Sequence, residues 1–186
     1  MNCQDINDPV HSRCMEALCH LTRFPDNNDL LAEYNEVKVA LHKCGTSMSS
    51  TDRLWALRTI QNITAHSSKR GYFMNTELLL LVSISAEQLD LIDEHETAMT
   101  ILGNLCTDPI AVIQITNTEN VMKVLVRIAN DNEYDPEVQF IACDALATIA
   151  MWMQRIAKAA SVPEGFSFEK LPTLRNMGYM RYNTNE

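Results

Sequence analysis

A short pattern of apolar residues recurs along this chain at almost constant spacing. It holds an apolar pair and one polar residue before a final Leu or Ile, and it occupies residues 17–21, 101–105, 145–149 and, more loosely, 59–63. The equivalent positions lie at steps of 42, 42 and 44 residues, and they are Leu18, Ile60, Leu102 and Leu146. A period in the forties in helical-looking sequence is typical of an α-solenoid, in which each unit buries its apolar face by stacking on the next.

Helix start and stop signals divide each period into a long helix, a short helix and a helix of intermediate length. The expected helices, in chain order, run from Pro9 to about Phe24, over 27–34 and 36–43, from Ser50 through Ile63, over 69–74 and 77–84, from Asp93 through Leu105, over 109–115 and 119–129, and from Asp135 through Ile149.

A second, smaller repeat consists of asparagines between the short helix and the one that follows. Asn35, Asn75 and Asn117 lie at steps of 40 and 42 residues. After Gly, Asn tolerates left-handed backbone best, so we expect these residues to form the sharp junctions between helices. Thr76 and Thr118, which come directly after two of them, are the expected helix N-caps.

The composition agrees with stacked helices. A 46% hydrophobic content over 186 residues suffices for a sizeable core, while 6% aromatic residues and five glycines fit packed helices better than a β-sandwich. The sequence holds no run of about 18 apolar residues that predicts a membrane span. The first ten residues lack the basic and apolar regions of a secretory signal, so we expect a cytoplasmic or nuclear protein that does not bind a membrane.

Six cysteines are spread along the chain without a CxxC pair, which makes a zinc ribbon or a thioredoxin-type site improbable. They are Cys3, Cys14, Cys19, Cys44, Cys106 and Cys143. We expect small, mostly buried hydrophobic side chains in a reducing compartment, and no metal site.

Charge and motifs argue against two further classes of function. The net charge of −9 disfavours nucleic-acid binding, because phosphates are bound by clustered Lys and Arg. No phosphate-binding loop, dinucleotide fingerprint, nucleophile elbow or HExxH pattern is present, so we expect neither an enzyme nor a bound cofactor. His95, between two glutamates, is interpreted as part of a solvated acidic turn rather than as an acid–base group.

The repeated segments resemble those of a known family, the armadillo repeats. The segment 135–150 (DPEVQFIACDALATIA) looks like the start of an armadillo unit, and the segments 8–21, 50–63 and 93–105 align with it. The resemblance covers roughly residues 8–155 and implies an all-α, right-handed solenoid of about three to four armadillo-type repeats, with HEAT repeats as the alternative because they share the helix spacing. It divides the chain into a repeat domain over residues 1–161 and a C-terminal capping segment or tail over 162–186.

The resemblance also implies a binding groove. In armadillo proteins the long third helix of each unit lines a concave groove, and an asparagine near its end holds the backbone of a partner peptide. A carboxamide both donates and accepts hydrogen bonds, so it can pair with a peptide group whatever the sequence of the partner. The corresponding positions here are His20, Asn62, Asn104 and Thr148.

One turn earlier on the same face the resemblance implies a second row of contacts, which would set the choice of partner side chains. This row consists of Glu16, Arg58, Thr100 and Asp144. Members of the family that import nuclear proteins carry tryptophans there, and their absence argues against a receptor for nuclear localisation signals. Glu16 and Asp144 could still attract a basic segment, and Trp55, on or beside the groove, is either part of the core or the natural binding hot spot.

Two function classes follow from the sequence. The first is a non-enzymatic interaction module that binds a peptide or helix of a partner protein in the groove. The second is a structural subunit that assembles end to end, with another copy or another chain, through an uncovered repeat face. The C-terminal segment is open to three interpretations, namely a cap over the last repeat, a mobile tail, or a basic aromatic strand in an acidic groove.

Overall fold

Ten helices make up the secondary structure of residues 9–160, the part of the chain that the computed structural model describes, and no strand occurs among these residues. The helices are α1 (Pro9–Thr22), α2 (Pro25–Leu31), α3 (Asn35–Gly45), α4 (Ser50–His66), α5 (Arg70–Phe73), α6 (Thr76–Ala86), α7 (Ile92–Cys106), α8 (Pro109–Asn117), α9 (Glu119–Asn130) and α10 (Pro136–Ala160). The all-α prediction and the order of the expected helices are confirmed. The predicted division at residues 161/162 falls outside the described residues and is not tested.

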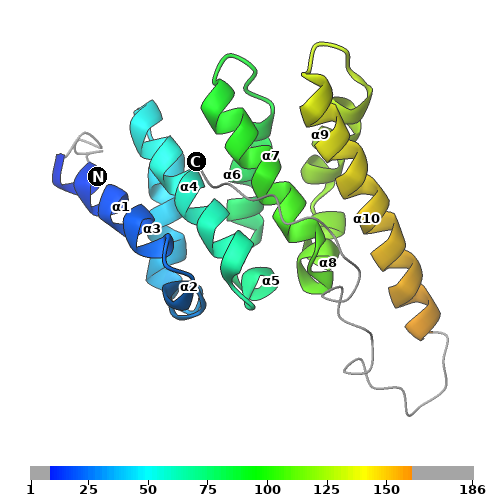
Figure 1. Cartoon of the computed structure of the whole chain (residues 1–186), viewed down its shortest axis with the longest axis horizontal. Helices are drawn as coiled ribbons and strands as arrows, with labels where there is room; N and C mark the ends of the chain where they lie inside the picture. Colours follow the sequence, from blue (N-terminus) through cyan, green and yellow to red (C-terminus); the bar gives the residue numbers. More distant parts are fainter. Residues whose placement is uncertain (1–8, 161–186) are drawn as a thin grey trace, which may run out of the picture.

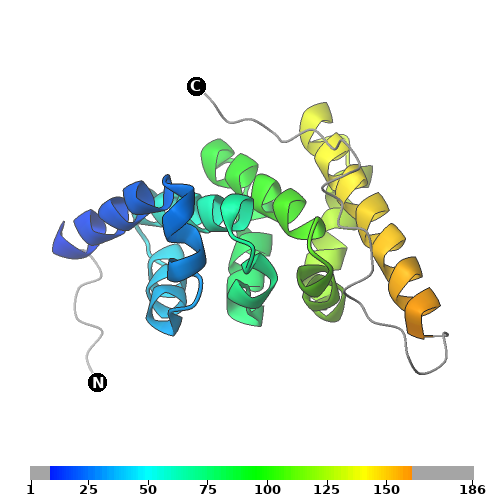
Figure 2. The same cartoon turned by 60° about the horizontal axis from the view of Figure 1, so that its bottom comes forward.

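The helices stack as repeated units in layers (Figures 1 and 2). The long helices α1, α4, α7 and α10 pack side by side and form one layer. Helices α3, α6 and α9 pack behind them and contact one another in the same order, while the short helices α2, α5 and α8 lie at the lower end in Figure 1. Consecutive helices turn sharply, so that α8 is bent by 118° from α7.

The core follows the 42-residue register. The side chains at all four equivalent apolar positions lie in or against one continuous core, and Ile60 on α4 and Leu102 on α7 are fully buried. Leu18 and Leu146, in the first and last long helices, are only partly buried. Each central long helix is covered on both sides by its neighbours, as expected when units bury their apolar faces by stacking.

Polar contacts tie successive units together at both ends of the long helices. Near the N-terminal ends of α4 and α7, the Arg53 guanidinium donates to both carboxylate oxygens of Glu94, at 3.0 and 2.9 Å. At the lower end, the Asp29 carboxylate accepts from the Ser67 hydroxyl and the Ser68 amide, each at 2.8 Å. These contacts fix how one unit sits on the next, because each of them joins residues about 40 positions apart.

The prediction that repeated asparagines form left-handed junctions is wrong. Asn75 has extended backbone, with φ −127° and ψ 173°, and its side-chain oxygen accepts from the Leu78 amide at 2.9 Å as the N-cap of α6. Asn35 is the first residue of α3 and Asn117 the last of α8. Of the three asparagines, Asn75 therefore serves as a capping residue, a role that Asn fills readily. Thr118 is the N-cap residue of α9, but its side chain makes no capping hydrogen bond.

Two interpretations of single residue types also need correction. Cys19, Cys44 and Cys106 are buried, as expected, but Cys14 and Cys143 are exposed. His95 is not part of a solvated turn: it is buried, its Nδ1 lies 2.7 Å from the carbonyl oxygen of Ala86, and its ring stacks on Tyr134. It folds inward because the second unit ends directly beneath the start of α7.

The last long helix has one covered side and one uncovered side. Helix α10 packs against α7, α8 and α9, yet Phe140 on its outer side is 62% exposed. Residues 136–158 of this helix have a mean hydropathy of 1.2 and, by length and composition alone, could cross a membrane. Only 22% of that stretch is buried. The stack therefore ends, within the described residues, on an apolar surface.

Candidate functional site

The nine residues expected to bind a partner all lie on the four long helices. Glu16 and His20 are on α1, Trp55, Arg58 and Asn62 on α4, Thr100 and Asn104 on α7, and Asp144 and Thr148 on α10. None of them is buried. We call the surface that these nine residues define the open face, because no described helix packs over it and α3, α6 and α9 lie on the opposite side (Figure 2).

Four of the nine residues meet at one spot on the open face, between α1 and α4. The ring centroids of His20 and Trp55 are 5.8 Å apart, and the Arg58 guanidinium lies 5.8 Å from the Trp55 ring centroid. The Glu16 carboxylate lies 3.9 Å from His20 Nε2. We call Glu16, His20, Trp55 and Arg58 the tryptophan cluster. It leaves part of a large aromatic ring accessible, flanked by a cationic group and an acidic group.

Trp55 is held by its surroundings, which suits it to binding. Its ring is partly exposed, and the cation–π contact with Arg58 and the contact with His20 restrict its orientation. An aromatic side chain has few rotatable bonds, so little conformational entropy is lost when a partner covers it. Trp152 differs: it is 5% exposed and belongs to the core, with Arg155 over its ring.

Asn62 has a structural role in addition to any role in binding. Its amide nitrogen donates to the Thr22 hydroxyl at 3.0 Å and lies 3.5 Å from the carbonyl oxygen of Cys19, so it ties α4 to α1. Its side-chain oxygen has no hydrogen bond with another described residue and could still accept one. The sequence did not single out Thr22, although this residue lies 40 positions before Asn62.

The remaining residues on α7 and α10 are not in contact with the tryptophan cluster. The Thr100 hydroxyl donates to the backbone of Glu96 at 2.9 Å, within its own helix. Asn104, one repeat after Asn62, makes no side-chain hydrogen bond within the described residues, and the same is true of Thr148. As far as residues 9–160 are concerned, both polar groups of the Asn104 carboxamide are therefore without a hydrogen-bond partner.

Charged residues that the sequence reasoning did not select also lie on the open face. Arg13 is exposed on α1, and Asp93, Glu96 and Glu137 are exposed on α7 and α10. The register could have identified them, because Arg13 lies 42 positions before Trp55, and Asp93 and Glu137 are separated by 44. They were missed because exposed charges are common on any helix.

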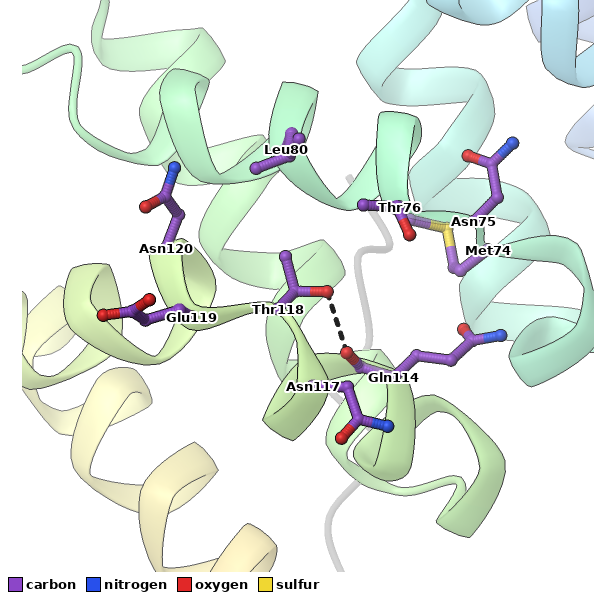
Figure 3. Close-up of a pocket in the computed structure, with 9 residues that line it drawn as sticks. All are labelled: Met74, Asn75, Thr76, Leu80, Gln114, Asn117, Thr118, Glu119 and Asn120. Atoms are coloured by element: carbon purple, nitrogen blue, oxygen red, sulfur yellow. Dashed lines mark hydrogen bonds between the residues drawn. The ribbon is translucent and has the colours of Figure 1, made fainter.

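A cavity lies away from the open face, between α6, α8 and α9 (Figure 3). It has a volume of about 590 Å³. Its lining residues are Met74, Asn75, Thr76, Leu80, Gln114, Asn117, Thr118, Glu119 and Asn120. Glu119 is the one ionisable group among them, and its hydrogen bond with Lys123 lowers the pKa of its carboxyl group. A single ionised carboxylate among amides and hydroxyls offers no acid–base pair for catalysis.

The buried cysteines are poorly suited to nucleophilic chemistry. Burial raises the pKa of the Cys44 thiol to about 11 and that of the Cys106 thiol to about 12. Desolvation by burial also raises the pKa of Cys19. The thiolate, which is the reactive form, is therefore scarce at neutral pH in these three side chains. Within residues 9–160, no group of three or more His, Cys, Asp or Glu side chains is arranged to hold a metal ion.

Comparisons with protein-family models, curated proteins and solved structures found no match to this chain.

Proposed function

We propose that this protein is a non-enzymatic interaction module that binds a segment of a partner protein on its open face, and that its units are of the armadillo type. The repeated order of a long, a short and an intermediate helix supports the armadillo assignment. The tryptophan cluster carries the functional part of the proposal, because it combines Trp and Arg, two of the residue types enriched at the hot spots of protein interfaces.

The open face offers a partner two kinds of contact. The tryptophan cluster supplies apolar area, while the free carboxamide of Asn104 can pair with a peptide N–H and C=O at once. Trp55 and Asn104 lie on adjacent long helices, so an extended segment that crosses the layer could contact both residues.

The test uses the purified chain and a displayed library of random 16-residue peptides, from which binding sequences are selected. The affinities of the selected peptides are then measured for the wild type, Trp55→Ala, Asn104→Ala and Tyr72→Ala. Tyr72 on α5 is 70% exposed and lies off the open face, which makes it a matched aromatic control. Thermal unfolding checks that each variant is folded.

We expect Trp55→Ala to weaken binding at least tenfold, or about 1.4 kcal/mol, and Tyr72→Ala to leave it unchanged. Asn104→Ala, which breaks no side-chain hydrogen bond within the described residues, should weaken binding without lowering stability. Selected peptides that bind Trp55→Ala and Asn104→Ala as tightly as the wild type would contradict the proposal.

A second candidate function is end-to-end assembly, and the outer side of α10 favours it. Gly103 on α7 faces Ile141 on α10, since a Cβ added to Gly103 would lie 3.8 Å from the Cγ2 atom of Ile141. One repeat later the position equivalent to Gly103 is Ala147, which is exposed beside Phe140. No described helix thus covers, in the last unit, the surface that contacts the next long helix in the inner units.

Analytical ultracentrifugation separates the two functions. If assembly through α10 is the main function, the intact chain sediments as a dimer or larger species at micromolar concentration, and Phe140→Asp converts it to a monomer. A monomeric wild type would exclude assembly of identical copies.

A further inference from the structure

The ionised side chains on the open face are divided by sign between its two halves. On α1 and α4 the exposed or partly exposed charges are Arg13, Arg58 and the single acid Glu16. On α7 and α10 they are Asp93, Glu96, Glu137 and Asp144. Arg155 and Lys158, near the C-terminal end of α10, are the two basic exceptions, and Arg155 lies over the Trp152 ring.

The register places these charges on the same side of their helices. Arg58 and Asp144 occupy equivalent positions two repeats apart, at steps of 42 and 44 residues through Thr100. Asp93 and Glu137 are likewise equivalent to each other. Residues at equivalent positions of stacked helices face the same way. The replacement of Arg58 by Asp144 two repeats later therefore changes the charge of the open face from positive to negative.

These charges are not neutralised within the molecule. Arg13, Arg58, Asp93, Glu96 and Asp144 make no ion pair with another described residue, whereas Arg127 and Glu87, on the opposite layer, pair with each other at 3.0 Å. Glu137 is also without an ion pair in the described part of the chain. Unpaired charges of one sign that are gathered on a surface raise the local concentration of an oppositely charged partner and set its orientation.

We infer that the open face binds a charge-segregated segment, whose acidic end lies over α1 and α4 and whose basic end lies over α7 and α10. This inference rests on the proposed function and specifies its partner. The orientation of the segment is fixed because a reversed one would place like charges opposite each other at both ends.

The size of the segment follows from helix packing. Four packed helices with axes about 8–10 Å apart span about 30 Å, which an extended chain crosses in about nine residues at about 3.3 Å per residue. The charged ends of the partner segment are then separated by a short neutral stretch that lies over the tryptophan cluster and Asn104.

The experiment uses two synthetic 14-residue peptides of identical composition. One has four glutamates at one end, six Gly, Ser and Leu residues in the middle and four lysines at the other end, and the second distributes the same charges in alternation. Isothermal titration calorimetry at low salt measures their affinities for the full chain. We expect the segregated peptide to bind at least tenfold more tightly, and to lose this advantage as salt screens the charges.

Charge-reversal variants test which half of the open face binds which end of the segregated peptide. Arg58→Glu and Asp144→Lys should each lower the affinity for the segregated peptide about fivefold to tenfold. A peptide with glutamates at both ends should bind the Asp144→Lys variant more tightly than it binds the wild type. Glu77→Lys is the matched control: Glu77 is exposed on α6, in the opposite layer, and the change in net charge equals that of Asp144→Lys.

The inference is overturned if the segregated peptide does not bind, if the alternating peptide binds equally well, or if Glu77→Lys weakens binding as much as Asp144→Lys. Failure of the proposed function has a different signature. If library-selected peptides depend on Trp55 but charge order has no effect, the open face remains a binding surface without the inferred polarity; if no peptide depends on Trp55, both proposals fall.

Discussion

At the scale of single residues, the Arg53–Glu94 pair shows how strongly one contact can depend on the fold. The Glu94 side chain is 5% exposed and that of Arg53 is 21% exposed, and Arg53 also donates to the carbonyl oxygens of Ser47 and Met48. The guanidinium thus has acceptors for most of its donors. A buried carboxylate is tolerated here because two charge-assisted hydrogen bonds compensate for its lost hydration.

We predict that Glu94→Gln lowers the free energy of unfolding by about 2 kcal/mol, because it leaves the Arg53 charge without its counter-ion. Urea unfolding followed by circular dichroism measures the change. Glu96→Gln, two residues away at an exposed position without an ion pair among the described residues, should cost less than about 0.5 kcal/mol. Equal losses in the two variants would show that the Arg53–Glu94 pair does not stabilise the fold.

The glycines provide a second prediction at this scale. A Cβ at Gly103, in the last turn of α7, would make only an ordinary contact with Ile141, whereas one at Gly71 would lie 2.5 Å from Asp108 Oδ1 and 3.0 Å from the Ala111 backbone nitrogen. Gly103→Ala should therefore raise stability by about 0.5–1 kcal/mol through helix propensity. Gly71→Ala should lower stability, because backbone atoms at the start of α8 would have to move. Differential scanning calorimetry tests the opposite signs.

At the scale of helices, two asparagines from the same sequence repeat have different roles. Asn75 caps α6 through the hydrogen bond from the Leu78 amide, whereas Asn117 ends α8 and makes no such bond. We predict that Asn75→Ala lowers the free energy of unfolding by about 1 kcal/mol and that Asn117→Ala changes it by less than about 0.5 kcal/mol. Chemical denaturation measures both changes, and similar losses in the two variants would show that the Asn75 cap does not stabilise α6.

The link between α2 and the loop after α4 should make stability depend on pH. The hydrogen bond from Ser67, with those from Ser68, lowers the pKa of the Asp29 carboxyl below its ordinary value of 3.8. A depressed pKa in the folded state contributes stability above the ordinary value, and this contribution is lost as the pH falls through the folded-state value. The wild type should therefore exceed Asp29→Asn in stability at about pH 6, and the difference should shrink towards about pH 3. Urea midpoints across this range measure it, and a difference that grows on acidification would contradict the assignment.

At the scale of the whole molecule, the local stability of each helix depends on how many long helices pack against it. Helices α4 and α7 pack between other long helices, whereas α1 and α10 each have a long neighbour on one side only within the described residues. In such a stack stability is roughly a sum of unit and interface contributions. We predict that hydrogen–deuterium exchange read by mass spectrometry is slowest in α4, α6 and α7 and fastest in α1 and the outer side of α10. Uniform protection along the chain would instead indicate one cooperative unit.

The sequence by itself determined the helical class and the order of the helices. These follow from periodicity, because a 42-residue step between apolar stripes fixes which side of each long helix turns inward. The boundaries of α8 and α9 were predicted closely, since Pro109 and Glu119 mark helix starts that depend on local chemistry alone.

Only the tertiary structure decided what each polar residue contacts. Asn62 bonds to α1, His95 turns into the core, and Glu94 meets Arg53 across 41 positions of sequence. The same holds for the open face. Trp55, His20 and Arg58 were predicted as separate contact residues, and the packing of α1 on α4 brings them together. The physical reason is that periodicity reports the average burial of a helix side, whereas a hydrogen bond or ring contact depends on the distance between two helices, which is set when the units stack.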